Sequence, residues 1–268
     1  MVAQAQVSVI IPCYRCAYTI DRAVTSVATQ TLQPAEVILV DDGSGDGTLQ
    51  DLHRLQATYP EGWIKVVARQ QNAGPGEARN AGWDVATQPY IAFLDADDSW
   101  HPQKIEIQYG WMLKHPEIAL TGHTTIVFID QGLTQTRHDP LRADFRPVRK
   151  NRILWSNCFS TPCIMLRRKL AMRFAQGKHH SEDYHLWLTI ACAGERMARC
   201  DLPLAYIHKA PYGASGLSAQ LWKMQKGQLD TYRRIRQAGC VSFILYLPLL
   251  GWSWARFFRR LVVSRFML

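Results

Sequence analysis

Three carboxylates follow directly on a short apolar run near the middle of the sequence. Asp95, Asp97 and Asp98 come after residues 90–94 in the stretch YIAFLDADDSW. An apolar run bounded by polar residues is typical of a buried strand. Acids this close repel one another unless a cation or ligand donors compensate them, and hard divalent ions bind one or two carboxylates together with substrate phosphates. The stretch indicates a metal and phosphate site; the alternative is a solvated acidic turn that caps the next helix.

The sequence before these acids predicts alternating strands and helices. The apolar runs expected to be strands are residues 7–11, 36–40, 64–68 and 90–94. Apolar residues at helical spacing predict helices at residues 19–30, near 49–55, and at 75–86 and 101–114. This order is typical of an α/β fold with a Rossmann-like, mostly parallel sheet and helices on both faces.

Polar residues gather where each predicted strand ends. These clusters are residues 12–15, 41–48, 72–79 and 95–99. Open α/β sheets bind ligands at the carboxyl ends of their strands, so the clusters are expected to form one site. The first strand is followed by Pro12-Cys13-Tyr14-Arg15 rather than by a Gly-x-Gly-x-x-Gly turn, which disfavours a dinucleotide-binding site.

The alternation stops after residue 116. Residues 118–129 contain strand-like runs, residues 131–150 form a polar, basic segment expected to be a loop, and residues 153–166 are expected to be extended. Residues 181–193 predict a helix with Glu182 and Asp183 in its first turn. The alternative is that acids at that position only stabilise the helix through its dipole.

Charge and cysteine content restrict the class of protein. The chain has 268 residues and a net charge of +9, of which +8 lies in residues 221–268, which hold nine Lys or Arg and one acid. No nucleic-acid-binding module accompanies these basic residues, so nucleic acid is not an expected partner. The seven cysteines show no disulfide framework, and the first residues do not resemble a signal peptide. Reduced cysteines and a cytoplasmic location are therefore expected.

Five motifs occur in an order that resembles family 2 glycosyltransferases with the GT-A fold, over about residues 7–195. They are VSVIIPCY, EVILVDDGSGDGT, NAGPGEARNAG, YIAFLDADDSW and SEDYHLWL. The resemblance implies an inverting transfer of a sugar from a nucleotide-diphosphate sugar, with a UDP-sugar favoured, to a hydroxyl of a glycan or lipid-linked acceptor. It also implies Mn²⁺ or Mg²⁺ as cofactor.

The same resemblance implies which residues bind the donor. Pro12 and Tyr14 would line the nucleobase pocket, and Asp42 would contact the base, with its neighbour Asp41 as a further candidate. Arg79 would lie near the base and the phosphates.

For the acidic stretch, the resemblance assigns Asp97 to the ribose side of the donor and to the metal, and Asp98 to direct metal ligation. Asp95 is a further candidate that could mainly hold the turn. A metal ion held there would stabilise the charge that grows on the diphosphate as the sugar–phosphate bond breaks.

Asp183 resembles the catalytic base, which takes the proton of the acceptor hydroxyl. Glu182 could bind the acceptor or cap the helix, and His208 lies in a segment that in many relatives closes over the phosphates or metal. Two other functions remain open: a sugar nucleotidyltransferase on a similar sheet, and a non-catalytic nucleotide- or glycan-binding relative.

The expected organisation is a GT-A domain at residues 1–220, with a nucleotide-sugar-binding half at 1–116 and an acceptor half at 117–220, followed by a basic, apolar region at 221–268. The apolar run at 240–254 is short for a membrane span.

The residues after that run suit a helix lying on an anionic membrane surface. Arg256, Arg259 and Arg260 are expected on one helical face, with apolar residues mostly opposite. A peripheral location on the inner face of the cell membrane is expected; a core-packed helix or a contact in a homo-oligomer is the alternative.

Overall fold

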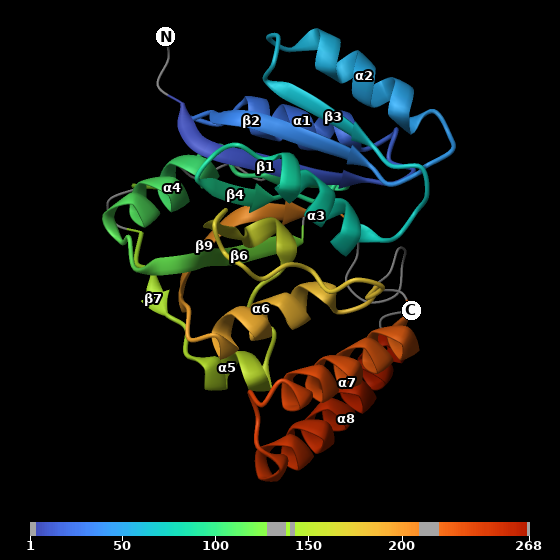
Figure 1. Cartoon of the computed structure of the whole chain (residues 1–268), viewed down its shortest axis with the longest axis vertical. Coiled ribbons are helices and arrows are strands. Elements are labelled where there is room, and N and C mark those ends of the chain that lie inside the picture. Colours follow the sequence, from blue (N-terminus) through green and yellow to red (C-terminus); the bar gives the residue numbers. More distant parts are fainter. Residues whose placement is uncertain (1–3, 128–137, 140–142, 209–219, 267–268) are drawn as a thin grey trace.

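The computed structural model describes residues 4–127, 138–139, 143–208 and 220–266 (Figure 1). The strands are β1 (Ala5–Cys13), β2 (Pro34–Asp41), β3 (Ile64–Ala68), β4 (Tyr90–Phe93), β5 (Asp98–Trp100), β6 (Ile118–Val127), β7 (Arg146–Pro147), β8 (Met165–Arg167) and β9 (Arg196–Ile207). The helices are α1 (Ile20–Ala28), α2 (Thr48–Thr58), α3 (Pro75–Val85), α4 (Lys104–Lys114), α5 (Lys150–Trp155), the 3-10 helix η2 (Thr161–Cys163), α6 (Glu182–Cys192), α7 (Leu221–Gln237) and α8 (Phe243–Phe266).

The described residues form one nine-stranded sheet in the order β3-β2-β1-β4-β8-β6-β9-β5, with β7 beside β9. The strands β3, β2, β1 and β4 pair in parallel. The pairs of β8 with β4 and β6, and of β5 with β9, are antiparallel, whereas β6 and β9 pair in parallel. The predicted α/β fold with a mostly parallel sheet is confirmed.

Helices cover both faces of the sheet because successive side chains of a strand point to opposite faces. Ile10 of β1 packs into a core with Trp83 of α3 and Leu186 of α6. Its neighbour Ile11 packs into a second core with Val24 of α1. Helices α1, α2 and α4 lie on this second face, and α3 and α6 on the first. Strands buried on both faces explain the continuous apolar runs in the sequence.

Three secondary-structure assignments made from the sequence were wrong. Residues 153–166 are not extended: they contain the end of α5, then η2, then the start of β8. The α5 carbonyl oxygens of Ile153 and Leu154 accept hydrogen bonds of 2.8 and 3.0 Å from the hydroxyl of Tyr184, a tertiary contact that an apolar run does not reveal. The helix predicted from residue 101 begins at Lys104, and part of the 95–99 turn is strand β5, which was not predicted.

The C-terminal region forms a helical hairpin, α7 and α8, that packs on the rest of the chain (Figure 1). Tyr232, Ile235 and Leu249 of the hairpin belong to the same core as Trp187 of α6. Within the described residues, no helix has both the length and the apolar content needed to cross a bilayer.

A disulfide joins Cys192 at the end of α6 to Cys240 at the turn between α7 and α8, with Cα atoms 5.5 Å apart. The expectation of reduced cysteines is therefore wrong at this pair. The two residues are 48 positions apart in the chain, and only the packing of the hairpin on α6 brings them within disulfide distance.

Replacement of glycine by alanine should have opposite effects on the free energy of unfolding at two helical positions. A Cβ at Gly82 of α3 would lie 2.5 Å from Cγ2 of Ile10, whereas a Cβ at Gly110 of α4 would meet nothing within 4 Å. Gly82→Ala should lower the free energy of unfolding by roughly 1–3 kcal/mol because it overpacks the helix–sheet contact. Gly110→Ala should raise it by up to about 1 kcal/mol through helix propensity. Urea unfolding of both variants measures this, and equal effects would contradict the close approach of α3 to β1.

Candidate active site

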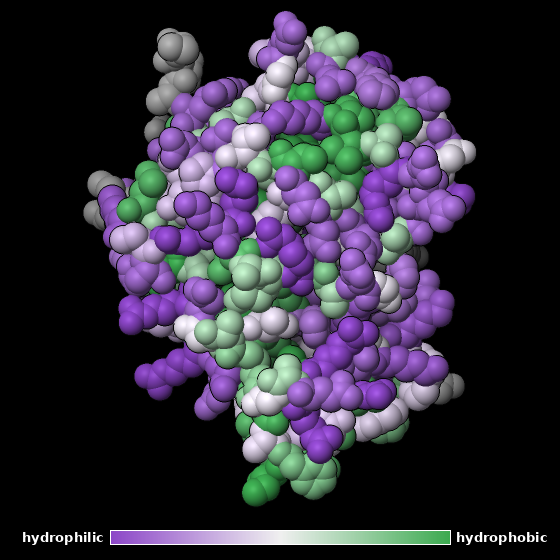
Figure 2. Space-filling model, viewed as in Figure 1, coloured by the Kyte–Doolittle hydropathy of each residue, from purple (hydrophilic) through white to green (hydrophobic). Residues whose placement is uncertain are grey.

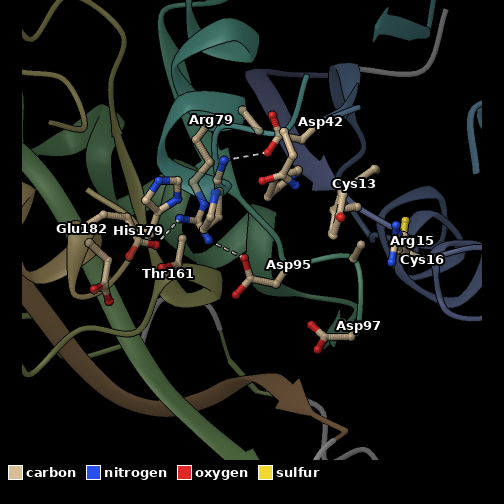
Figure 3. Close-up of a pocket in the computed structure, with 18 of the residues that line it drawn as sticks. Cys13, Arg15, Cys16, Asp42, Arg79, Asp95, Asp97, Thr161, His179 and Glu182 are labelled. Carbon is tan, nitrogen blue, oxygen red and sulfur yellow. Dashed lines mark hydrogen bonds and ion pairs between the residues drawn. The ribbon is translucent and has the colours of Figure 1, made fainter. Parts of the chain in front are cut away.

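A cavity of about 600 Å³ opens at the carboxyl ends of the parallel strands, between these ends and the start of α6 (Figure 3). Residues from both halves of the chain line it: Pro12, Tyr14, Arg15, Asp42, Asn72, Arg79, Asp95, Asp97, Thr161, His179, Glu182, Asp183 and Met224. The volume is within the range of small-molecule sites. Eight of the predicted site residues thus line one cavity, as expected if ligands bind at the carboxyl ends of the strands.

Asp42 and Asp41, which are adjacent in sequence, have different surroundings. The Asp42 carboxylate accepts hydrogen bonds from Arg69 Nη1 at 2.5 Å and from the backbone N–H of Gly74 at 2.8 Å. Asp41 is buried and accepts from the backbone N–H and hydroxyl of Ser44. Asp42 therefore lines the cavity, whereas Asp41 holds the turn after β2.

Tyr14 presents its ring at the cavity wall next to Pro12. The ring is 46% exposed, and the guanidinium of Arg15 lies 5.2 Å from its centroid. Arg15 has a positive φ of 50°, and its backbone N–H donates to Ser44 Oγ at 3.1 Å. This contact fixes the loop after β1 against the turn after β2, and it leaves an aromatic face available for a planar ligand.

Arg79 joins three elements inside the cavity. Its Nη2 donates to Asp95 Oδ1 at 2.7 Å and its Nη1 to Glu182 Oε1 at 2.9 Å (Figure 3). The side chain is 4% exposed. Burial lowers the pKa of Arg79, but the charges of Asp95 and Glu182 outweigh burial and raise that pKa above its ordinary value. The guanidinium therefore stays charged and connects α3, the end of β4 and the start of α6.

The predicted base, Asp183, lies in the first turn of α6. Ser181, just before the helix, has a left-handed φ of 55°, a sparsely populated conformation for a residue other than glycine. Burial, followed by the charge of Glu182, raises the pKa of Asp183 to about 7. Asn157 Nδ2 lies 3.4 Å from Asp183 Oδ2. A carboxyl group with a pKa near neutrality can accept and release a proton at physiological pH.

Asp97 lines the cavity, whereas Asp98 is buried at the start of β5. Pairing of β5 with β9 places Asp98 opposite Ile207, next to His208. Ser99 Oγ lies 2.7 Å from His208 Nε2. The structure thus brings His208 beside the acidic stretch, 109 positions earlier in the chain.

The acidic stretch fits a particular kind of metal site. Among the residues that the structure describes, no group of three or more His, Cys, Asp or Glu side chains could hold a metal ion alone. Asp95 is engaged by Arg79; the other carboxylates of the stretch are Asp97, which lines the cavity, and Asp98, which is buried at the start of β5. Such a donor set fits a hard cation that completes its coordination with water and ligand phosphate oxygens.

Further residues of this site were not predicted from the sequence, among them Thr161 and Met224, which line the cavity, and Arg69, which binds Asp42. Arg69 follows β3 directly, so the rule that polar residues at strand ends form the site would have found it. Thr161 lies in η2, and the wrong assignment of residues 153–166 concealed it.

Comparison with known proteins places the chain among glycosyltransferases. The sequence model of glycosyl transferase family 2 matches residues 8–174. The amylovoran biosynthesis glycosyltransferase AmsE of Erwinia amylovora is 28% identical over 85% of this chain and 85% of its own length. The UDP-Glc:alpha-D-GlcNAc-diphosphoundecaprenol beta-1,3-glucosyltransferase WfgD of Escherichia coli is 31% identical over 69% of each chain.

Solved structures share the fold. S. aureus TarS, residues 1–349 in complex with UDP-GlcNAc, superposes with a TM-score of 0.69 at 21% identity, covering 95% of this chain and 72% of that fragment. The mannosyltransferase PcManGT of Pyrobaculum calidifontis, in complex with GDP-Man and Mn²⁺, gives a TM-score of 0.66 at 19% identity, covering 98% and 75%. The fold is therefore GT-A, and because the family model covers more than half of the sequence, the chain belongs to glycosyl transferase family 2 and is a glycosyltransferase.

Proposed function

We propose that the chain transfers a sugar from a UDP-sugar to a hydroxyl of a lipid-linked or cell-surface glycan, with inversion at the anomeric carbon. The observation that supports this most directly is that one cavity contains both a base-sized aromatic wall, at Tyr14, and a carboxyl group with a pKa near 7, at Asp183. The donor class and the acceptor class follow the names of WfgD and of the TarS complex.

The residues of the cavity suggest how the donor is held. The nucleobase would lie against the Tyr14 ring, in the turn after β1, and Asp42 would lie at the edge of the base. The ribose and diphosphate would then extend toward Asp97. Both oxygens of the Asp42 carboxylate accept hydrogen bonds, from Arg69, Ala73 and Gly74, so Asp42 would contact the base through a remaining acceptor position. Arg79 would act on the donor through Asp95, whose orientation it sets.

At the opposite wall, Asp183 would take the proton of the acceptor hydroxyl. The hydroxyl oxygen forms its bond to the anomeric carbon as the bond from that carbon to the diphosphate oxygen breaks, and the nucleoside diphosphate leaves. A general base of this kind contributes roughly 10²–10⁴-fold to the rate.

A divalent ion would complete the donor site. Asp97 and Asp98 would hold Mn²⁺ or Mg²⁺, with His208 as a further candidate ligand. When bound, the ion supplies Lewis-acid stabilisation of the diphosphate charge. Family membership disfavours the nucleotidyltransferase alternative, and a non-catalytic relative would show no turnover with any donor.

The proposal is tested first by turnover. Incubation of the chain with a panel of UDP-, GDP- and dTDP-sugars, with Mn²⁺ or Mg²⁺ and with diphosphate-linked lipid acceptors, should release UDP and transfer the sugar with inverted anomeric configuration. Absence of nucleoside diphosphate release with every donor would refute the transferase activity, and a retained configuration would refute the single displacement.

Asp183→Asn should lower kcat by roughly 10²–10⁴-fold, because the amide cannot accept the proton, and should leave UDP affinity within about twofold. In the unchanged chain, kcat/KM should fall as the pH drops below about 7, since protonation removes the base. Asp84→Asn, at an exposed position on α3, is the matched control. Full activity of Asp183→Asn would assign the base elsewhere.

Arg79→Gln should move the acid limb of the kcat/KM profile to higher pH, because the charge of Arg79 lowers the pKa of Asp183. It should also cost about 3–5 kcal/mol in the free energy of unfolding, because Asp95 and Glu182 lose their buried partner. Adding Glu182→Gln should move the limb back to lower pH, since Glu182 raises that pKa. An unshifted limb in both variants would show that Asp183 is not the group that titrates.

Asp98→Ala should abolish the increase in UDP affinity that Mn²⁺ produces and leave metal-free affinity unchanged. Isothermal titration of UDP with Mn²⁺ and with EDTA measures both quantities, and Asp84→Ala is the control. If Asp98→Ala keeps the full Mn²⁺ effect and Asp97→Ala loses it, Asp97 alone is the protein ligand.

A further inference from the structure

The outward side of α8 is almost entirely apolar. We call it the outer α8 face; its exposed residues are Phe243, Ile244, Leu247, Pro248, Gly251, Trp252, Ala255, Phe258, Arg259, Leu261 and Val262. Among the α8 residues whose exposure the structure describes, Arg259 is the only charged member of this face. The positions recur every three or four residues, so they form one continuous stripe along the helix. Ile244 is 85% exposed and Phe258 58%, which is unusual for side chains of this size on a soluble surface.

The opposite side of α8 is already occupied by the chain itself. Leu249, Ser253 and Phe257 are buried, and Ser253 Oγ accepts a hydrogen bond of 2.9 Å from Gln225 of α7. The hairpin core is therefore complete without the outer α8 face, which α5 and α7 contact at its edges, through Trp252 and Phe243. Figure 2 shows hydrophobic residues at the lower tip of the molecule, where the hairpin turns in Figure 1.

Basic side chains flank the outer α8 face along α7. Lys226, Arg233 and Arg236 are exposed at helical spacing on that helix. The guanidinium of Arg236 lies 5.0 Å from the centroid of the Phe243 ring, so the basic row of α7 adjoins the apolar stripe directly.

The other flank is formed by α5. Trp252 Nε1 and Arg256 Nη1 both donate to the carbonyl oxygen of Trp155, each at 2.9 Å. Lys150 and Arg152 are exposed on α5. The two tryptophans therefore lie at the edge of the stripe, between its apolar centre and a second group of basic side chains.

We infer that the outer α8 face binds an anionic lipid bilayer, with α8 lying along the membrane surface. An apolar stripe enters the acyl region, tryptophans favour the interface, and Lys and Arg attract anionic headgroups. A second copy of the chain fits this surface less well, because a symmetric contact would bring two like-charged basic flanks together.

Bilayer binding through this face would also orient the cavity. Met224 of α7 lines the cavity, and Lys178, shortly before α6, donates to the carbonyl oxygen of Gly227 on α7 at 2.8 Å. The hairpin and the start of α6 thus form one packed unit, so a lipid-carried acceptor in the same bilayer would be close to Asp183. The binding surface itself does not depend on the proposed reaction.

Sedimentation of the full chain with vesicles tests the inference. Vesicles of phosphatidylcholine with phosphatidylglycerol should bind the chain at least tenfold more strongly than phosphatidylcholine alone, and 0.5 M salt should weaken the binding. Leu247→Glu on the outer α8 face should lower the partition coefficient at least tenfold. Leu113→Glu on α4 is the matched control, because both leucines are 52% exposed, and it should bind as the unchanged chain does.

A second variant tests the charged flank. Arg233→Gln with Arg236→Gln should remove most of the preference for anionic vesicles and keep the circular dichroism of the unchanged chain. Equal binding of Leu247→Glu and Leu113→Glu would overturn the inference. So would a dimer in the absence of lipid that Leu247→Glu dissociates, because the face would then be a contact between two copies. Turnover with a short soluble acceptor should be unaffected by Leu247→Glu, which separates a failure of this inference from a failure of the proposed function.

Discussion

A single buried guanidinium connects the two halves of this molecule. Arg79 comes from α3, in the half built by the alternating strands and helices, and it binds Glu182, which lies 103 positions later, together with Asp95 at the end of β4. Burying an arginine costs several kcal/mol unless its partners are present and well placed. The position of α6 over the strand ends therefore depends on the charge balance of the cavity. Loss of the charge on Asp95 or Glu182 would alter both the position of α6 and that balance.

The same charges determine the proton affinity of Asp183. Burial and the neighbouring carboxylate of Glu182 raise its pKa, whereas Arg79 and two hydrogen bonds lower it, with a result of about 7. Without Arg79 the pKa of Asp183 would be higher, and without burial it would be lower. From the sequence motif, Arg79 was expected to lie near the base and the phosphates of the donor. The structure adds an electrostatic role, because the charge of Arg79 lowers the pKa of Asp183.

The first half of the fold follows from periodicity, because each strand is a short apolar run whose two faces are both covered. Its site residues follow from the same rule, since parallel strands place Asp42, Asp95 and Asp97 at one edge. The second half of the fold, and its part of the site, depend on contacts between residues that are far apart in the sequence. The hydroxyl of Tyr184 stabilises α5, where an extended segment was expected. Neither the Arg79–Glu182 pair nor the Cys192–Cys240 disulfide has a local sequence signal.

The C-terminal helix shows how packing changes the meaning of a sequence pattern. Arg256, Arg259 and Arg260 share a helical face in projection, but the structure separates their roles. Arg256 donates to Trp155, and Arg260 Nη2 lies 3.4 Å from Gln225 Oε1, so both approach the hairpin core and α5, whereas Arg259 is exposed. The basic charge available to a membrane comes instead from α7 and α5, on either side of an apolar stripe. The amphipathic surface is formed by three packed helices rather than by α8 alone. The unit that would bind a bilayer is therefore α8 together with α7 and α5, and not an isolated α8 peptide.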